Sequence, residues 1–298
     1  MSSLSSIVRE EGANGARSDS ASPRRSEIPH GVQDRFLRDA ARRRQAEAAL
    51  RDSFARWGYN EVITPTFEYY DNLIRGASPG LQLAMYRFLD REGHTLALRA
   101  DFTPQLARAA ATKLFDQPMP LRCSYLGSVF RYEEPQAGRK REFTQAGVEL
   151  IGVDTAAADA EAVALGISAL DALPLPEFQV NLGQMALFRA LTGGLSSASV
   201  AAIRDAIDHK NAIRLEAALD SAAVTGHHRA VLRQLPDLVG GPEVLERART
   251  LCERLGRADN SLSAVDRLAS VYQLLEVHGV GDRVILDLGE VRGMDYYT

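Results

Sequence analysis

The sequence predicts an α+β fold: a mainly antiparallel sheet flanked by helices, with a helical insertion. Two long strand candidates, Arg122–Tyr132 and Glu142–Ile151, are joined by a charged loop, which is the pattern of an antiparallel hairpin. Residues 184–278 differ from the rest of the chain because Ala, Leu, Arg and Asp dominate them and because glycines and prolines divide them into short segments. We therefore expect a strand-rich frame that carries a helical insertion at about 184–278.

The other elements follow from the spacing of the apolar residues and from the glycines and prolines that end each segment. In chain order they are a helix over Asp34–Trp57, a strand over Glu61–Thr64, a hairpin of Tyr86–Leu89 with Thr95–Leu98, a helix after Asp101, a helix over Ala157–Leu173, and strands over Phe178–Leu182 and Val284–Leu288. Gly58 ends the first helix, and Pro65 closes the strand that follows it. Pro104 suits an early turn of the helix after Asp101.

The composition is that of a globular protein and not of a fibre, a disordered chain or a membrane protein. The 298 residues are 45% hydrophobic and 25% charged, and no stretch approaches the ~20 apolar residues that a membrane-spanning helix needs. The formal net charge of −4 argues against broad, non-specific nucleic-acid binding. Cys123 and Cys252 match no metal or redox spacing, so we expect a reduced, cytoplasmic compartment.

Residues 1–27 are predicted to form a disordered N-terminal extension. They are rich in Ser, Ala, Gly and Arg, so they bury too little apolar surface to offset the entropy cost of ordering them. They also lack the continuous apolar core of a secretory signal. A misassigned start codon is the alternative origin of this segment, and the ordered domain is expected over 28–298.

The strand Glu142–Ile151 places polar side chains around a glycine. Alternation puts Gln145, Gly147 and Glu149 on one face of the sheet and an ordinary apolar set on the other. Arg131 lies at the end of the preceding strand. Lone charges on central strands are costly unless they are paired. We therefore interpret Arg131, Gln145 and Glu149 as functional residues and not as a solvated surface.

The register of the hairpin decides what lies between these residues. If the loop closes so that Arg131 faces Phe143, then Gly127 faces Gly147. Two opposed glycines would leave a floor without side chains, on which a small ligand could approach the backbone. The sequence therefore predicts a small-ligand site on this face of the sheet.

Several stretches resemble the class II aminoacyl-tRNA synthetases in their histidyl form. The second motif of that family is matched by Phe130-Arg131-Tyr132-Glu133, the Pro135–Arg139 loop and Gln145–Glu149, and its histidyl-specific element by Arg292–Thr298. The helix, strand and Pro65 upstream fit its dimer-forming first motif. The resemblance covers about 28–298 and implies the class II synthetase-like fold. Because the family continues with further strands after this point, we expect either a truncated form or a fold that ends early with an unpaired edge strand.

Within this resemblance two functions compete. The first is histidine–tRNA ligase, which activates histidine with ATP. The second is its non-catalytic paralogue, the regulatory subunit of ATP phosphoribosyltransferase, the first enzyme of histidine biosynthesis. The stretches similar to the second are Leu98–Pro104, Arg141–Gly152, Asn181–Arg189 and Leu235–Leu245.

The sequence around Asp101 favours the regulatory subunit. Ligases usually carry Arg-Pro-Glu-Gly-Thr where this chain has Arg99-Ala100-Asp101-Phe102-Thr103. The shorter acid and the bulky Phe102 would re-shape the site near a bound ammonium group. A synthetase-like fragment with a purely structural role is a third alternative.

The resemblance implies a site for free L-histidine and no catalytic residue, metal or cofactor. The expected histidine-binding residues are Asp101, Thr103, Arg131, Gln145, Glu149, Arg292 and Tyr297. Carboxylates and a hydroxyl suit the ammonium group, a guanidinium suits the carboxylate, and Tyr297 or an acidic side chain suits the imidazole. The alternative for Asp101 is a helix N-cap ahead of Pro104, and one residue can do both.

The resemblance also implies the partners. They are the short-form catalytic subunit of ATP phosphoribosyltransferase and a second copy of this chain, as a homodimer within a hetero-oligomer that the family suggests is a hetero-octamer. Histidine binding is expected to confer feedback sensitivity on that complex. Binding to tRNA or to a membrane is not expected.

Overall fold

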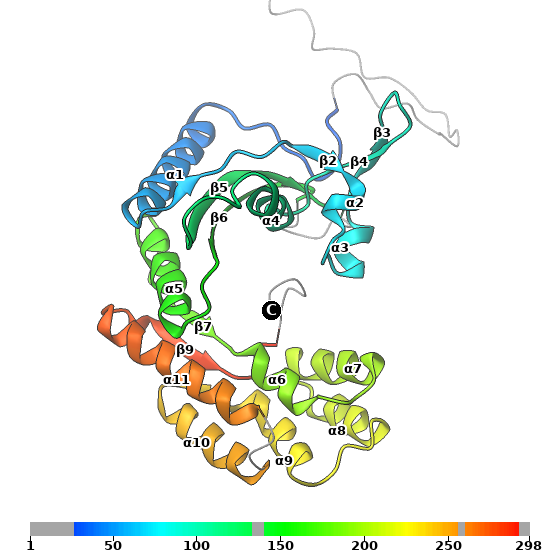
Figure 1. The fold of residues 1–298 in the computed structure, drawn as a ribbon, viewed down its shortest axis with the longest axis vertical. Coiled ribbons are helices and arrows are strands. Elements are labelled where there is room, and N and C mark those ends of the chain that lie inside the picture. The colour runs from blue at the N-terminus through cyan, green and yellow to red at the C-terminus, as the bar shows by residue number, and fades with distance from the viewer. Residues whose placement is uncertain (1–26, 133–139, 256–259, 292–298) are drawn as a thin grey trace, which may run out of the picture.

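The computed structural model describes residues 27–132, 140–255 and 260–291, and within them the fold is α+β with three small sheets (Figure 1). Most strand pairs are antiparallel, and two short pairs are parallel. Apart from Glu27, the predicted N-terminal extension lies outside the described residues, as does the Pro135–Arg139 loop.

The long hairpin is confirmed. Its strands are β5 (Leu121–Phe130) and β6 (Glu142–Ile151), which pair antiparallel along all ten residues. A short strand, β1 (Asn60–Glu61), runs parallel to β5 on its other side. β1 is shorter than the predicted strand. The Val62 backbone N–H still donates to the Ser124 carbonyl of β5 at 2.8 Å, but the Thr64 carbonyl accepts a hydrogen bond from the Arg99 guanidinium at 3.0 Å.

Helices cover both faces of this hairpin. Apolar residues of β6 pack on α1 (Leu37–Arg56) and α5 (Ala156–Asp171) on one face. The other face is covered by α4 (Thr103–Thr112), which Figure 1 shows lying across β5 and β6. Leu106 and Ala110 of α4 are the buried contacts, since three to four residues of spacing places them on one side of the helix.

The predicted register of the hairpin is wrong by two residues. The Arg131 backbone N–H donates to the Arg141 carbonyl at 2.9 Å, so the hairpin closes on Arg141 and not on Phe143. The Arg141 backbone N–H in turn donates to the Gly31 carbonyl at 2.7 Å. The segment before α1 therefore holds the closing end of the hairpin in this register.

The corrected register separates the two glycines that were expected to face each other. Gly127 lies opposite Gln145, and Gly147 lies opposite Tyr125. Each glycine is thus paired with a residue that has a long side chain, and the two sit on the same face of the sheet because paired residues share a face.

A second sheet forms beside this hairpin. It contains β2 (Phe67–Tyr69), β4 (Thr95–Leu98) and β3 (Arg87–Leu89), in the order β2-β4-β3. The predicted β3–β4 hairpin is confirmed, and β2 was not predicted. Two short helices, α2 (Tyr70–Leu73) and α3 (Pro79–Leu83), pack beside it.

Residues 184–278 are mostly helical, as the sequence predicts. The helices are α6 (Met185–Leu191), α7 (Ser197–Asp208), α8 (Ala212–Ser221), α9 (Gly226–Gln234), α10 (Glu243–Cys252) and α11 (Ser261–Val277), with 3-10 turns at Leu235–Asp237, Glu253–Leu255 and Gly281–Arg283. They share one apolar core with the third sheet. Within the described ranges, none of the helices has the length and apolar character that a membrane crossing requires.

The third sheet joins the helical part to the rest of the chain. Its strands are β7 (Val180–Leu182), β9 (Val284–Asp287) and β8 (Val239–Gly240), in the order β7-β9-β8. The predicted strands at β7 and β9 are confirmed, and β8 was not predicted.

The outer edge of β6 has no neighbouring strand among the described residues. An apolar cavity of about 550 Å³ opens beside it, between β6, α5 and β7. Val148 of β6 and Leu165 and Leu170 of α5 are among the residues that line it.

One polar cluster ties α5 to β5 and to the end of α1. Arg122 donates two hydrogen bonds to the Glu161 carboxylate at 2.8 and 2.9 Å, and the Tyr59 hydroxyl donates a third at 3.0 Å. The Arg122 hydrogen bond lowers the pKa of Glu161 against the opposing effect of burial, and the Tyr59 hydrogen bond lowers it further. Burial, followed by the hydrogen bond to Glu161, raises the pKa of Tyr59.

We expect Glu161→Gln to lower the free energy of unfolding at pH 7 by about 1–2 kcal/mol, because hydrogen bonds to a charged, partly buried carboxylate are replaced by weaker ones. The folded-state pKa of Glu161 lies below its unfolded value, so the stabilisation is complete above the unfolded pKa and is lost as pH falls through the folded one. Urea unfolding should therefore show wild type and variant converging at acidic pH, below the folded-state pKa of Glu161. The exposed Glu177→Gln is the control, and an equal loss in both variants would contradict this account.

Candidate functional site

A short segment, residues 99–103, fixes the polar face of the hairpin. It connects β4 to α4 and bonds to the end of β5 through its backbone. The Arg99 carbonyl accepts the Phe130 backbone N–H at 2.9 Å, and the Ala100 carbonyl accepts Arg131 Nε at 2.9 Å. The Arg131 guanidinium is therefore held by the Ala100 carbonyl, with its Nη2 atom on the side of Asp101.

Asp101 is buried at the centre of this segment, with 2% of its surface exposed. Its Oδ1 atom accepts the Thr103 backbone N–H at 3.1 Å and the Gln145 side-chain amide Nε2 at 3.2 Å. Its Oδ2 atom lies 3.8 Å from an Arg131 Nη2. Since Thr103 is the first residue of α4, Asp101 supports the start of the helix and also contacts the polar face, as the sequence allowed.

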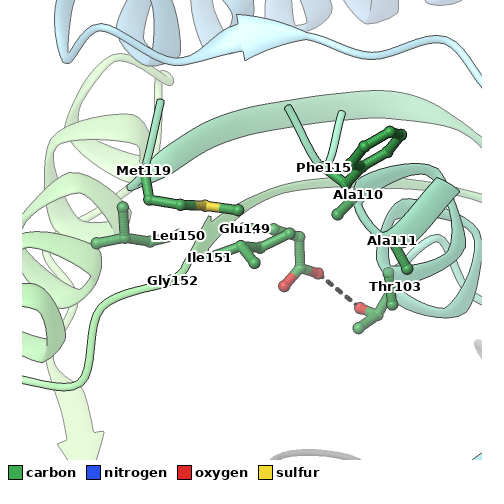
Figure 2. Close-up of a pocket in the computed structure, with 10 residues that line it drawn as sticks. Thr103, Ala110, Ala111, Phe115, Met119, Glu149, Leu150, Ile151 and Gly152 are labelled. Atoms are coloured by element: carbon green, nitrogen blue, oxygen red, sulfur yellow. Dashed lines mark hydrogen bonds between the residues drawn. The ribbon is translucent and has the colours of Figure 1, made fainter. Parts of the chain in front are cut away.

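Glu149 and Thr103 form the second polar contact. The Thr103 hydroxyl donates to Glu149 Oε1 at 2.7 Å (Figure 2), and Glu149 is 9% exposed. Glu149 lies opposite Cys123 in the hairpin. Burial, and then the nearby Glu149 charge, raises the pKa of the Cys123 thiol, which therefore stays protonated near neutral pH.

The structure brings together five of the seven predicted site residues: Asp101, Thr103, Arg131, Gln145 and Glu149. The other two, Arg292 and Tyr297, lie outside the described residues. The five include two carboxylates and one guanidinium, so they carry an excess of negative charge. The Gln145 side-chain oxygen is buried without a hydrogen-bond partner in the described structure. This arrangement suits a ligand that presents a positively charged hydrogen-bond donor.

The predicted floor of bare glycine is wrong, because the chain fills it with its own side chains. A Cβ on Gly127 would lie 3.0 Å from the Phe102 ring, and a Cβ on Gly147 would lie 2.6 Å from Tyr125 Cζ. The glycines thus make room for Phe102 and Tyr125 and not for a ligand.

Open space lies instead at the end of β6. A cavity of about 570 Å³ opens between α4 and this strand end (Figure 2). Its wall is mostly apolar and is formed by Ala107, Ala110, Ala111, Phe115, Met119, Leu150, Ile151 and Gly152, together with Thr103 and Glu149. The apolar wall was not predicted from the sequence. The four-residue spacing of Ala107, Ala111 and Phe115 could have indicated it, because this spacing places them on one side of a helix.

One further group of potential metal ligands occurs among the described residues, on the turn between β3 and β4. Asp90, Glu92 and His94 place one ligand atom each within 4.8 Å of one another. The Asp90 carboxylate already accepts the backbone N–H groups of Glu92 and His94 and contacts the His94 ring at 3.0 Å. These are the contacts of a turn, and they account for the cluster without an ion.

Comparison with known proteins gives one consistent family. The family model described as histidyl-tRNA synthetase matches residues 31–298. The ATP phosphoribosyltransferase regulatory subunit of Moorella thermoacetica is 40% identical over 274 residues, which cover 91% of this chain and 69% of the relative. That of Geobacter metallireducens is 38% identical over 279 residues, which cover 93% of this chain and 63% of the relative. The chain therefore spans about two thirds of the length of these relatives.

Solved structures agree with the sequence relatives. An ATP phosphoribosyltransferase regulatory subunit/histidyl-tRNA synthetase from Bacillus halodurans superimposes with a TM-score of 0.83 at 31% identity, over 93% of this chain and 72% of that one. A histidine–tRNA ligase subunit from Alicyclobacillus acidocaldarius gives a TM-score of 0.75 at 25% identity, over 93% and 84%. The likeness extends over nearly the whole chain.

We expect Thr103→Val to lower the free energy of unfolding by about 1–2 kcal/mol, because it removes a hydrogen bond to the buried Glu149 carboxylate without changing the side-chain shape. Thr112→Val is the matched control on the same helix. The Thr112 hydroxyl bonds the Arg108 carbonyl at the exposed end of α4, so its loss should cost less than about 0.5 kcal/mol. Denaturant unfolding measures both, and equal losses would contradict the special role of Thr103.

Proposed function

The chain belongs to the histidyl-tRNA synthetase family, on the branch whose members are named ATP phosphoribosyltransferase regulatory subunits, and we propose that it acts as the non-catalytic regulatory subunit of that enzyme. The single observation that carries the proposal is the 40% identity to such a subunit over 91% of the chain. In this role the chain binds a short-form catalytic subunit and serves the first step of histidine biosynthesis. The histidine–tRNA ligase function is not favoured, because the relatives from Moorella thermoacetica and Geobacter metallireducens are both named as regulatory subunits.

We propose that the polar face of β5 and β6 binds free L-histidine. The ammonium group is placed near Asp101 and Gln145, whose carboxylate and buried amide oxygen are the acceptors that such a group requires. The excess negative charge of the site supports this placement. The histidine carboxylate is assigned to Arg131, whose guanidinium is already oriented by the Ala100 carbonyl.

The imidazole ring is assigned to the space beside Glu149. The Glu149 carboxylate accepts a ring N–H, and the apolar wall of the 570 Å³ cavity contacts the ring carbons. Arg292 and Tyr297 remain proposed ligands from the sequence resemblance, for the carboxylate and the imidazole. A ligand with an ammonium, a carboxylate and a polar aromatic ring matches these groups one by one.

Histidine acts in this proposal as a signal to the catalytic subunit. Its binding favours a less active state of the partner, with a coupling of about 1–3 kcal/mol that is reciprocal between the two binding events. The assembly proposed from the family resemblance is a homodimer within a hetero-octamer in the cytoplasm, and it does not bind tRNA.

We expect the purified chain to change the activity of a short-form catalytic ATP phosphoribosyltransferase subunit and to make that activity sensitive to histidine. Glu149→Gln should raise the histidine concentration needed for half-inhibition by about tenfold, because it removes the charge beside the ring, while the complex still forms. Glu142→Gln, on the opposite face of β6, is the control and should change nothing. If the chain alters neither the activity nor its response to histidine, the regulatory role is wrong; histidine-dependent ATP–pyrophosphate exchange would establish the ligase instead.

We also expect each charged group of histidine to contribute to binding. Titration calorimetry with histidinol, which lacks the carboxylate, and with imidazolepropionate, which lacks the ammonium, should give affinities at least about tenfold weaker than histidine. Arg131→Gln should weaken the binding of histidine but leave the affinity for histidinol nearly unchanged, because Arg131 is assigned to the histidine carboxylate. Equal weakening of both ligands by this variant would place Arg131 outside the carboxylate site.

A further inference from the structure

Phe102, Arg99 and Tyr125 form a stacked column beneath the candidate site. The Phe102 and Tyr125 rings lie 4.6 Å apart between centroids with an interplanar angle of 15°. The Arg99 guanidinium carbon lies 4.1 Å from the centre of the Phe102 ring on the other side. All three residues are at least 93% buried, so the column is part of the interior.

We infer that Phe102 is a positioning residue, an inference that rests on the proposed ligand site. Its place in this column fixes its two sequence neighbours, Asp101 and Thr103, in the orientation that binds the ligand. Phe102 itself touches no ligand in this proposal. It acts through the two residues beside it.

The Arg99 end of the column is hydrogen-bonded to the backbone. Arg99 Nε donates to the Ser128 carbonyl at 2.7 Å, and its Nη1 donates to the Thr64 carbonyl at 3.0 Å. Burial lowers the pKa of this guanidinium, which donates hydrogen bonds to the carbonyl groups of Ser128, Thr64 and Pro65. The Phe102 ring face is the remaining partner, as in a cation–π contact. The column therefore cannot shift without breaking hydrogen bonds to two other segments.

The sheet is shaped to admit the column. Gly127 and Gly147 lie beneath it, and a Cβ at Gly127 would lie 2.9 Å from Arg99 Nη2 and 3.0 Å from Phe102 Cζ. At Gly147 the added carbon would lie 2.6 Å from Tyr125 Cζ. Any larger residue at either position would push a ring out of the stack.

The column reaches the site through one peptide unit on each side of Phe102. Asp101 accepts the Thr103 backbone N–H and the Gln145 amide, and the Thr103 hydroxyl donates to Glu149. The backbone of Phe102 is helical, with φ −85° and ψ −32°, and this conformation sets the angle between its two neighbours. A rotation at Phe102 would therefore move two of the proposed ligand groups together.

The test compares Phe102→Leu, Gly127→Ala and the double variant by titration calorimetry with histidine. Each single variant should weaken the binding of histidine about tenfold, since Phe102→Leu removes a stacked ring and Gly127→Ala displaces the side chains above it. The double variant should bind better than the sum of the two losses predicts, because leucine removes the Phe102 Cζ contact of the new methyl group and leaves only its contact with the Arg99 guanidinium. Gly166→Ala on α5, where nothing lies within 4 Å of the added carbon, is the matched control and should leave affinity unchanged.

The outcomes separate this inference from the proposed function. Unchanged affinity in both single variants, or strictly additive losses in the double variant, would overturn the positioning role even if the melting temperature falls. If the wild-type protein binds no histidine, the proposed function fails. The positioning role is then read from the Gln145 side-chain amide resonances, identified by their loss in Gln145→Glu. Phe102→Leu should shift them by moving Asp101, and unshifted resonances would refute it.

Discussion

The fixed register of the β5–β6 hairpin is the constraint on which the rest of the structure depends. A slip of one residue would exchange the two faces of a strand, and a slip of two would move each side chain to the next pair on its own face. The closure of the loop on Arg141 places Gln145 opposite Gly127 and Glu149 opposite Cys123. The contact between Gln145 and Asp101 depends on that choice, because the partner segment is anchored to the end of β5.

The two faces of this hairpin differ in the polar groups that they bury. The face toward α1 and α5 is apolar, and burying it supplies the hydrophobic free energy that holds the hairpin. The face toward α4 also buries apolar residues, but Glu149 and the adjacent Asp101 cost free energy to bury and accept hydrogen bonds from Thr103 and Gln145. A protein under selection for stability alone gains little from that second face, so its polar groups favour a binding role.

The sequence predicted the hairpin, the helices around it and the residues that converge on its polar face, because strand alternation and motif resemblance are both local properties. It did not predict the register, which is set partly by a backbone contact from Gly31, over a hundred residues from Arg141. The sequence also suggested that the two glycines leave an open surface, whereas the stacked Phe102 and Tyr125 rings fill that space. The short strands β2 and β8 were not predicted for the same reason: pairing with strands distant in sequence stabilises them, and their own residue pattern does not indicate a strand.

The packing of the polar face bears on the proposal that an amino acid serves here as a signal. A sensor site needs charge complementarity and a fixed geometry, whereas a ligase site must also hold a second reactant in line with the first. In this chain Phe102 and Tyr125 fill the space that Gly127 and Gly147 leave in the sheet, and a cavity with a mostly apolar wall lies at the end of β6. Such a wall suits the carbon atoms of a ring, and Glu149 beside it can accept a ring N–H. The charges and the apolar wall of the site are thus compatible with the histidine-binding role that we propose from the family.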